Sequence, residues 1–161
     1  MCTNCHTGGS AISVSNGIST TIPAEGYTPG QTYSITVGFD LIKTGYGAYG
    51  FELSAQDFLG NHVGTMTNNT NASSWGGYMG NNNTATSPTT WTFDWVAPLA
   101  GTGSFSFYAA SVNGDGDGTE FNDEVLKTSL MINEASATSV GEINDSYKLT
   151  ANVTAVSYTH L

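Results

Sequence analysis

The sequence predicts an all-β domain, a two-sheet sandwich of about seven strands. Apolar and polar residues alternate in several short runs, which is the pattern of strands with one buried face. Glycine, threonine, serine and asparagine are abundant, and 11% of the residues are aromatic. That composition is typical of β-branched and aromatic strands joined by tight turns. No stretch keeps the apolar period of about 3.6 residues that an amphipathic helix needs.

The first half of the chain contains three candidate strands. Residues 18–22 form a short β-like stretch, and a turn follows at residues 27–30, where Pro29 presets φ and Gly30 supplies a left-handed residue. The next strand alternates cleanly, and its apolar face consists of Tyr33, Ile35, Val37 and Phe39. A third run alternates in the same way through Tyr49, Phe51 and Leu53.

The second half opens with a long polar segment. Residues 67–90 are rich in Asn, Thr, Ser and Gly, too polar to fill a core, so we expect a surface loop or an edge hairpin there. Two alternating strands follow, with apolar faces formed by Trp91, Phe93 and Trp95 and by Phe105, Phe107 and Ala109. A Gly/Asp loop at 113–124 then leads to a last strand at about 125–132. We interpret the aromatic residues as core rather than as a cofactor box.

The net charge of the chain limits the classes of binding partner that it can have. The 161 residues suffice for one domain and carry a net charge of -10, with three lysines and no arginine. Nucleic acid is excluded as a partner because phosphate binding needs a basic face, and an anionic membrane surface is disfavoured for the same reason. No apolar run approaches the roughly 20 residues of a membrane span. An acidic surface does admit calcium.

The chain begins with a Cys-x-x-Cys-His motif. Cys2 and Cys5 have the spacing at which two thiols add to the two vinyl groups of one haem, and His6 then lies under the iron as the proximal ligand. The alternatives are a disulfide, a dithiol redox pair or half of a zinc site. A redox pair would need a thioredoxin-like α/β context, and zinc would need further ligands, whereas His62 is the one internal histidine.

A sixth haem ligand would come from His62, Met66 or Met79. His62 belongs to a Gly-Asn-His-Val-Gly turn and is expected to be exposed enough to coordinate; the alternative is a solvated loop histidine. Histidine ligation would lower the reduction potential and methionine ligation would raise it.

The Gly/Asp loop fits a calcium-binding pattern. Asn113, Asp115 and Asp117 alternate, Gly118 permits a sharp bend, and Glu124 stands at the twelfth position. Strands rather than helices flank this loop, so the alternative is a solvated acidic turn. No nucleophile–histidine–acid set can be assembled from the sequence, and we therefore expect a protein that is not an enzyme.

The order of these motifs resembles one family. The series runs through Cys-x-x-Cys-His-x-Gly-Gly, Tyr27-x-Pro-Gly-x-x-Tyr33, Gly60-Asn-x-x-Gly64-Thr, Trp91-x-Phe-x-Trp95-x-Ala-Pro, Gly103-x-Phe-x-Phe-Tyr-Ala-Ala110 and Asp123-Glu-Val125. Residues 1–133 are similar in this to the choice-of-anchor domain, which is related to the reeler domain and is common in surface proteins of Bacteroidota-like bacteria. The resemblance implies a reeler-like, immunoglobulin-like sandwich outside the cell and no settled enzymatic activity.

The organisation of the chain follows from these motifs. We assign residues 1–16 to an extended haem-motif leader, 17–134 to the sandwich, and 135–155 to a linker that resembles the start of a type IX secretion sorting domain. Residues 156–161 resemble the translated end of a sequencing adapter. We expect an exported protein of the extracellular space or cell surface, with no signal peptide in this sequence and a true N-terminus that lies upstream.

Two functions fit the sequence. The first is an extracellular monohaem c-type protein that transfers electrons to a redox partner. The alternative is a structural or adhesive cell-surface module without a redox role, which self-associates as a fibre subunit.

Overall fold

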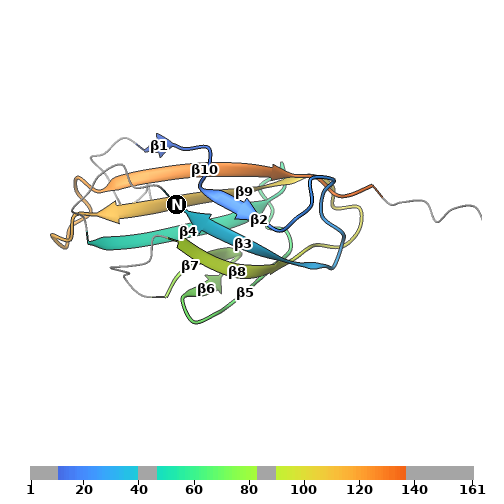
Figure 1. Cartoon of the computed structure of the whole chain (residues 1–161), viewed down its shortest axis with the longest axis horizontal. Helices are drawn as coiled ribbons and strands as arrows, with labels where there is room; N and C mark the ends of the chain where they lie inside the picture. Colours follow the sequence, from blue (N-terminus) through green and yellow to red (C-terminus); the bar gives the residue numbers. More distant parts are fainter. Residues whose placement is uncertain (1–10, 40–46, 83–89, 137–161) are drawn as a thin grey trace, which may run out of the picture.

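The computed structural model describes residues 11–39, 47–82 and 90–136, which form the two-sheet, all-β sandwich that the sequence predicts (Figure 1). The strands are β1 (Ile12–Ser13), β2 (Ile18–Thr20), β3 (Thr32–Gly38), β4 (Ala48–Gln56), β5 (Thr65–Thr67), β6 (Ala72–Trp75), β7 (Tyr78–Asn81), β8 (Thr90–Val96), β9 (Phe105–Gly114) and β10 (Glu124–Ile132). None of the described residues belongs to a helix that could cross a membrane.

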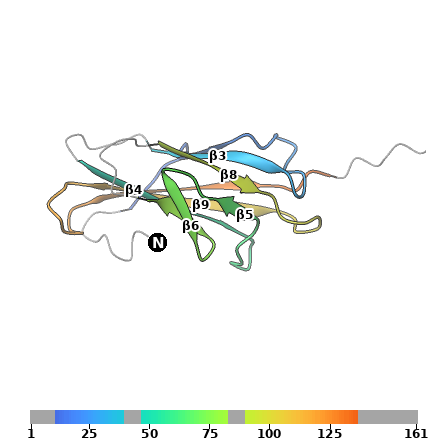
Figure 2. The ribbon, with the colours of Figure 1, turned by 90° about the horizontal axis from the view of Figure 1, so that it is seen from below.

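The strands are divided between a six-stranded and a four-stranded sheet. The larger sheet has the order β1-β10-β9-β4-β7-β6, and the smaller has the order β2-β3-β8-β5. Every pairing of neighbouring strands is antiparallel except that of β1 with β10. Figure 2 shows the two layers from the side, with β3 and β8 in one and β4 and β9 in the other.

The core lies between the sheets and contains the predicted apolar faces. Tyr33, Ile35 and Val37 of β3 are buried, as are Trp91, Phe93 and Trp95 of β8 and Phe105, Phe107 and Ala109 of β9. The ring of Trp95 is fully buried, with its centroid 5.0 Å from that of Phe105 and 5.3 Å from that of Phe107. Aromatic contacts at such distances add to the free energy that burial of the rings contributes.

The polar segment after β5 forms the edge hairpin that we expected as one of two alternatives. Strands β6 and β7 are antiparallel, with Ala72 opposite Asn81 and Trp75 opposite Tyr78. They add two strands to the larger sheet. The expectation that this segment is too polar to contribute to the core is wrong, because Ala72 and Met79 have no exposed surface. Strands of two to four residues, such as β1, β5, β6 and β7, show too few alternations for a period of two to reveal them.

The larger sheet begins inside the segment that we assigned to the leader. Ile12 and Ser13 pair with Leu126 and Lys127 of β10, and the amide of Val14 donates to the carbonyl of Lys127 at 2.9 Å. The chain then crosses to β2 in the other sheet. At Gly17 a Cβ atom would lie 2.7 Å from both Phe39 and Thr128, so the crossing passes close to the core where a side chain would not fit.

Candidate functional site

The residues predicted to bind haem, Cys2, Cys5 and His6, lie outside the described residues. The structure does show where the leader joins the sandwich. Strand β1 attaches its end to β10, at one edge of the larger sheet. Ile12 and Ser13 of the leader therefore lie at this edge of the sheet.

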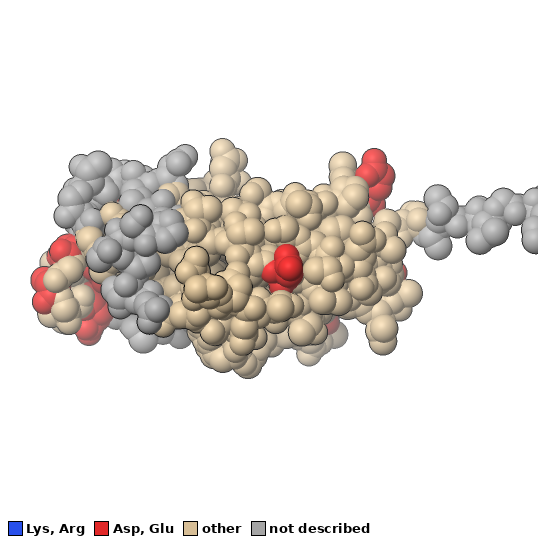
Figure 3. All heavy atoms as spheres, turned by 60° about the horizontal axis from the view of Figure 1, so that its bottom comes forward, with Lys and Arg blue, Asp and Glu red and all other residues tan. Residues whose placement is uncertain are grey.

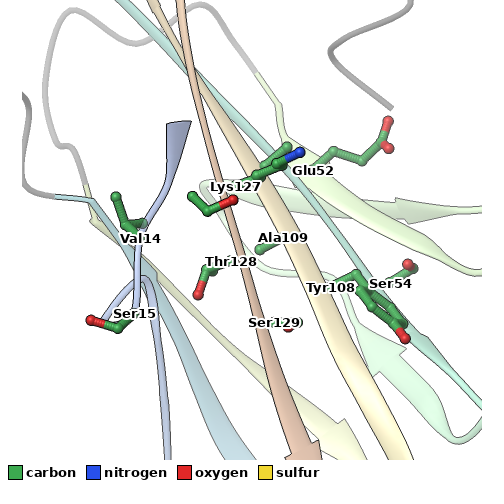
Figure 4. A pocket seen from close by; sticks show the side chains of 11 residues that line it. Val14, Ser15, Glu52, Ser54, Tyr108, Ala109, Lys127, Thr128 and Ser129 are labelled. Atoms are coloured by element: carbon green, nitrogen blue, oxygen red, sulfur yellow. The ribbon is translucent and has the colours of Figure 1, made fainter. Parts of the chain in front are cut away.

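A groove of about 500 Å³ lies beside β1 on the larger sheet (Figure 4). Val14 and Ser15 form one side, β10 and β9 form the floor, and Glu52 and Ser54 of β4 form the far side. Most of its lining residues are small, which is why the surface is hollow there: Ser13, Val14, Ser15, Ser54, Ala109, Ala110, Thr128 and Ser129.

The larger side chains of the groove stand in two cross-strand rows. Strand register places Glu52 opposite Ala110 and Ala110 opposite Lys127. The second row pairs Tyr108 with both Ser54 and Ser129 by the same register. Directly opposed residues lie on the same face of a sheet, so the carboxylate, the phenol and the ammonium share one outer surface.

Two of the three predicted sixth ligands line a different, smaller pocket. This pocket of about 280 Å³ includes His62 and Met66 and borders the β6–β7 hairpin, at the edge of the larger sheet that is opposite β1. His62 is exposed, as expected, but its ring packs edge-on against that of Tyr78, with the two ring centroids 4.8 Å apart. A Cβ on Gly77 would lie 2.4 Å from the His62 ring, so the ring also lies against this backbone.

The third candidate, Met79, occupies a different environment. It is opposite Leu53 in the β4–β7 register, has no exposed surface and belongs to the core cluster. In the folded sandwich its thioether therefore faces the other sheet rather than either surface pocket.

The predicted calcium residues are divided between the sheet and the loop. Asn113 and Glu124 are buried partners in the β9–β10 register, and the Asn113 amide donates to the Glu124 carboxylate at 3.2 Å. Asp115 and Asp117 are exposed in the loop. Among the residues that the structure describes, no three His, Cys, Asp or Glu side chains are grouped as metal ligands. Calcium binding by this loop stays a prediction.

The loop carboxylates instead bind their own backbone. Asp117 accepts hydrogen bonds from the Thr119 amide at 2.7 Å and the Thr119 hydroxyl at 2.8 Å, and these donors lower the pKa of its carboxyl group. The Asp115 carboxylate accepts from the Asp117 amide at 3.1 Å. These are Asx-type turns, which stabilise a loop without any ion.

Sequence reasoning missed a hydrogen-bonded carboxylate, that of Glu134, at the far end of the sandwich. Glu134 accepts hydrogen bonds from the amides of Gly101 and Gly103 at 2.9 and 2.8 Å and from the hydroxyl of the buried Tyr27 at 3.3 Å. The amide donors lower the pKa of Glu134, while burial and the nearby carboxylate raise the pKa of Tyr27 to about 12. The only signal in the sequence was Tyr27, which begins the Tyr-x-Pro-Gly motif.

The comparisons with known proteins identify the fold. The sequence matches no protein-family model and no curated protein. Among solved structures, the reeler domain of human F-spondin is similar, with a TM-score of 0.58, 19% identity and coverage of 78% of this chain and 94% of that one. A second fragment of the same human domain has a TM-score of 0.54 at 20% identity, covering 77% of this chain and 95% of that one. The Reelin-N domain of F-spondin has a TM-score of 0.59 at 19% identity, covering 80% and 93%. The chain therefore has a reeler-like β-sandwich fold.

Proposed function

We propose that this protein is an exported β-sandwich domain that carries one c-type haem on its N-terminal leader and transfers single electrons. The Cys-Thr-Asn-Cys-His motif at residues 2–6 carries this proposal. In the attachment reaction each cysteine S–H adds across one haem vinyl C=C bond, which forms a thioether and needs no oxidant. His6 would hold the iron, and a bound haem would supply the one-electron chemistry.

The fold supports an extracellular setting for this chemistry. Its likeness to the F-spondin reeler domain agrees with the expectation of an exported surface protein. Haem attachment to such motifs takes place outside the cytoplasm, so export and the motif are consistent with each other. Strand β1 supports the proposal in a second way, because it attaches the end of the leader to the sheet.

Mass spectrometry tests the proposal directly. The full chain is expressed with an export signal in a host that has haem-attachment machinery. Its intact mass is expected to exceed the polypeptide mass by one haem, and its Soret absorbance is expected to survive acid–acetone extraction. The Cys2→Ala/Cys5→Ala variant is the matched control and should keep the polypeptide mass. An unmodified wild-type mass would refute the haem assignment.

The second candidate is a structural or adhesive surface module, including a fibre subunit. One observation supports it: the fold is similar to that of the F-spondin reeler domain. A folded, colourless protein from the same haem-attaching host would support this candidate over the first.

A further inference from the structure

We propose that the outer face of the larger sheet binds a neutral oligosaccharide, which stacks on Trp75 and Tyr108 and hydrogen-bonds to Glu52 on the strand between them. The inference goes beyond the proposed haem function and does not depend on it, because these residues all belong to the sandwich. A row of aromatic side chains, two adjoining hollows and the charges that line them point to this ligand.

Three aromatic side chains stand in one row across the larger sheet. Strand register places Trp75 opposite Tyr78, and Ser54 of β4 lies opposite both Tyr78 and Tyr108. Directly opposed residues share one face of a sheet. It is the outer face, because Leu53, which alternates with Ser54 on β4, belongs to the core. Trp75 is 50% exposed and Tyr108 is 42% exposed, so two large rings on this face remain half in contact with water.

The surface beside the aromatic row is low. In the neighbouring row Glu52 lies opposite Gly80 on β7 and Ala110 on β9, which have little or no side chain. The Trp75 ring uses the space at Gly80, where a Cβ atom would overlap with the indole Cη2. A hollow of about 480 Å³ results, here named the Trp75 hollow; its lining includes Trp75, Asn81, Glu52, Gly50, Val112 and Thr119.

The Trp75 hollow adjoins the groove beside β1. Glu52 lines both, and Tyr108 lines the groove, as Figure 4 shows. Trp75 on β6 and Tyr108 on β9 are three strand spacings apart in the sheet, about 14 Å. A ligand that contacts both rings is therefore an extended chain rather than a single small molecule.

The charges along the two hollows favour a neutral ligand. Glu52 and Lys127 lie in one row with Ala110 between them, two strand spacings or about 10 Å apart. A ligand with many charges of one sign is repelled at one of these two positions. Lys127 is the one Lys or Arg among the described residues, and the chain has a net charge of -10. Figure 3 likewise shows acidic and no basic side chains among the coloured residues of its face.

An oligosaccharide matches this lining. The faces of a pyranose ring carry C–H groups that pack on an aromatic ring, while its hydroxyl groups donate and accept hydrogen bonds at the rim. Carboxylate and amide groups each make several hydrogen bonds, so Glu52 and Asn81 suit such hydroxyls. Asn81 is held in place, because its Oδ1 accepts from the Phe51 amide at 3.0 Å. A few fixed polar groups beside apolar platforms are typical of ligand sites.

Tryptophan fluorescence of the full chain reports on this contact. Trp91 and Trp95 are buried, whereas Trp75 is half exposed. The protein is first screened on an array of neutral β-glucans, xylans, mannans and galactans, with heparin as the anionic probe and spermine as the cationic probe. Titration with the hexasaccharide of a glycan that binds is expected to shift the emission to shorter wavelength and to reduce acrylamide quenching.

Two variants and one control test the stacking. Trp75→Ala and Tyr108→Ala are each expected to weaken binding by about tenfold or more, as for other aromatic anchors. Phe58→Ala is the matched control, because Phe58 is a 91% exposed aromatic residue outside the lining of both hollows, and it should leave the affinity unchanged. Calorimetry measures the affinities, and urea midpoints show that the variants fold.

Each outcome decides the proposal. Binding of a neutral glycan that both variants weaken supports it. Absence of binding across the array overturns it, as does binding that Trp75→Ala and Tyr108→Ala leave unchanged. Binding of spermine alone, lost in Glu52→Gln, would make the face a cation site and overturn it too. The Cys2→Ala/Cys5→Ala variant should bind the glycan like the wild type, so a failure of haem attachment and a failure of glycan binding are distinguished.

Discussion

Gly64 is the position at which the structure makes its sharpest stability prediction. Its φ is +70°, and a Cβ atom there would lie 2.4 Å from the indole Cε2 and Nε1 of Trp95. The indole has no room to retreat, because it packs against Phe105 and Phe107 and its Nε1 donates to the Val63 carbonyl at 3.2 Å. We therefore expect Gly64→Ala to combine backbone strain with overpacking of the core.

Gly60 provides a matched control for the backbone term. Its φ is +84°, but a Cβ there would meet nothing within 4 Å. A left-handed conformation costs a residue with a Cβ about 1–2 kcal/mol, and overpacking of a core costs about 1–3 kcal/mol. Gly60→Ala should thus lose about 1–2 kcal/mol of unfolding free energy, and Gly64→Ala about 2–5 kcal/mol.

Urea unfolding monitored by tryptophan fluorescence measures both losses. The midpoints convert to free energies as long as the slopes of the variants agree. A double-variant cycle with Trp95→Phe then isolates the contact, because the smaller ring should reduce the penalty of Gly64→Ala. Equal losses for Gly60→Ala and Gly64→Ala, or no coupling to Trp95→Phe, would refute the reasoning.

Three further predictions concern the ends of the domain. Removing the charge by Glu134→Gln should weaken the acid dependence of stability. The lowered pKa of Glu134 stabilises the folded protein above the usual carboxyl pKa of 4.5, and this contribution is lost as pH falls below that value. The unfolding free energies of wild type and variant should therefore converge in acid. Tyr27→Phe should cost about 1–2 kcal/mol for the lost hydroxyl hydrogen bonds. It should also reduce the loss of stability that wild type shows between pH 10.0 and about 12, because the raised pKa of Tyr27 contributes to that loss; an equal alkaline loss in wild type and variant would contradict this. If haem links copies into fibres, light scattering of the haem-loaded chain should increase with concentration, whereas the Cys2→Ala/Cys5→Ala variant stays monomeric; two equally monomeric samples would exclude haem-linked assembly.

The sequence predicted the interior of the sandwich well because burial imposes a local pattern. In β3, β8 and β9 every second side chain faces the other sheet, so Ile35, Phe93 and Phe107 can be assigned to the core from alternation alone. The motif from Gly60 to Gly64 was also visible in the sequence, but the sequence did not show why a glycine is needed at position 64. Only the packed structure places the Trp95 indole against the Gly64 backbone.

The candidate site depended far more on tertiary structure. The haem motif is a local pattern of residues, so the sequence alone determined the cofactor hypothesis. The groove is not local: β1, β4, β9 and β10 build it, and its lining residues span positions 13 to 129. Met79 illustrates the same limit, because it lies in a polar segment and only its pairing opposite Leu53 places it in the core. Local periodicity in the sequence indicates which face of a strand is buried. Pairing between distant strands decides which residues become neighbours, and this pairing produces no periodic pattern in the sequence.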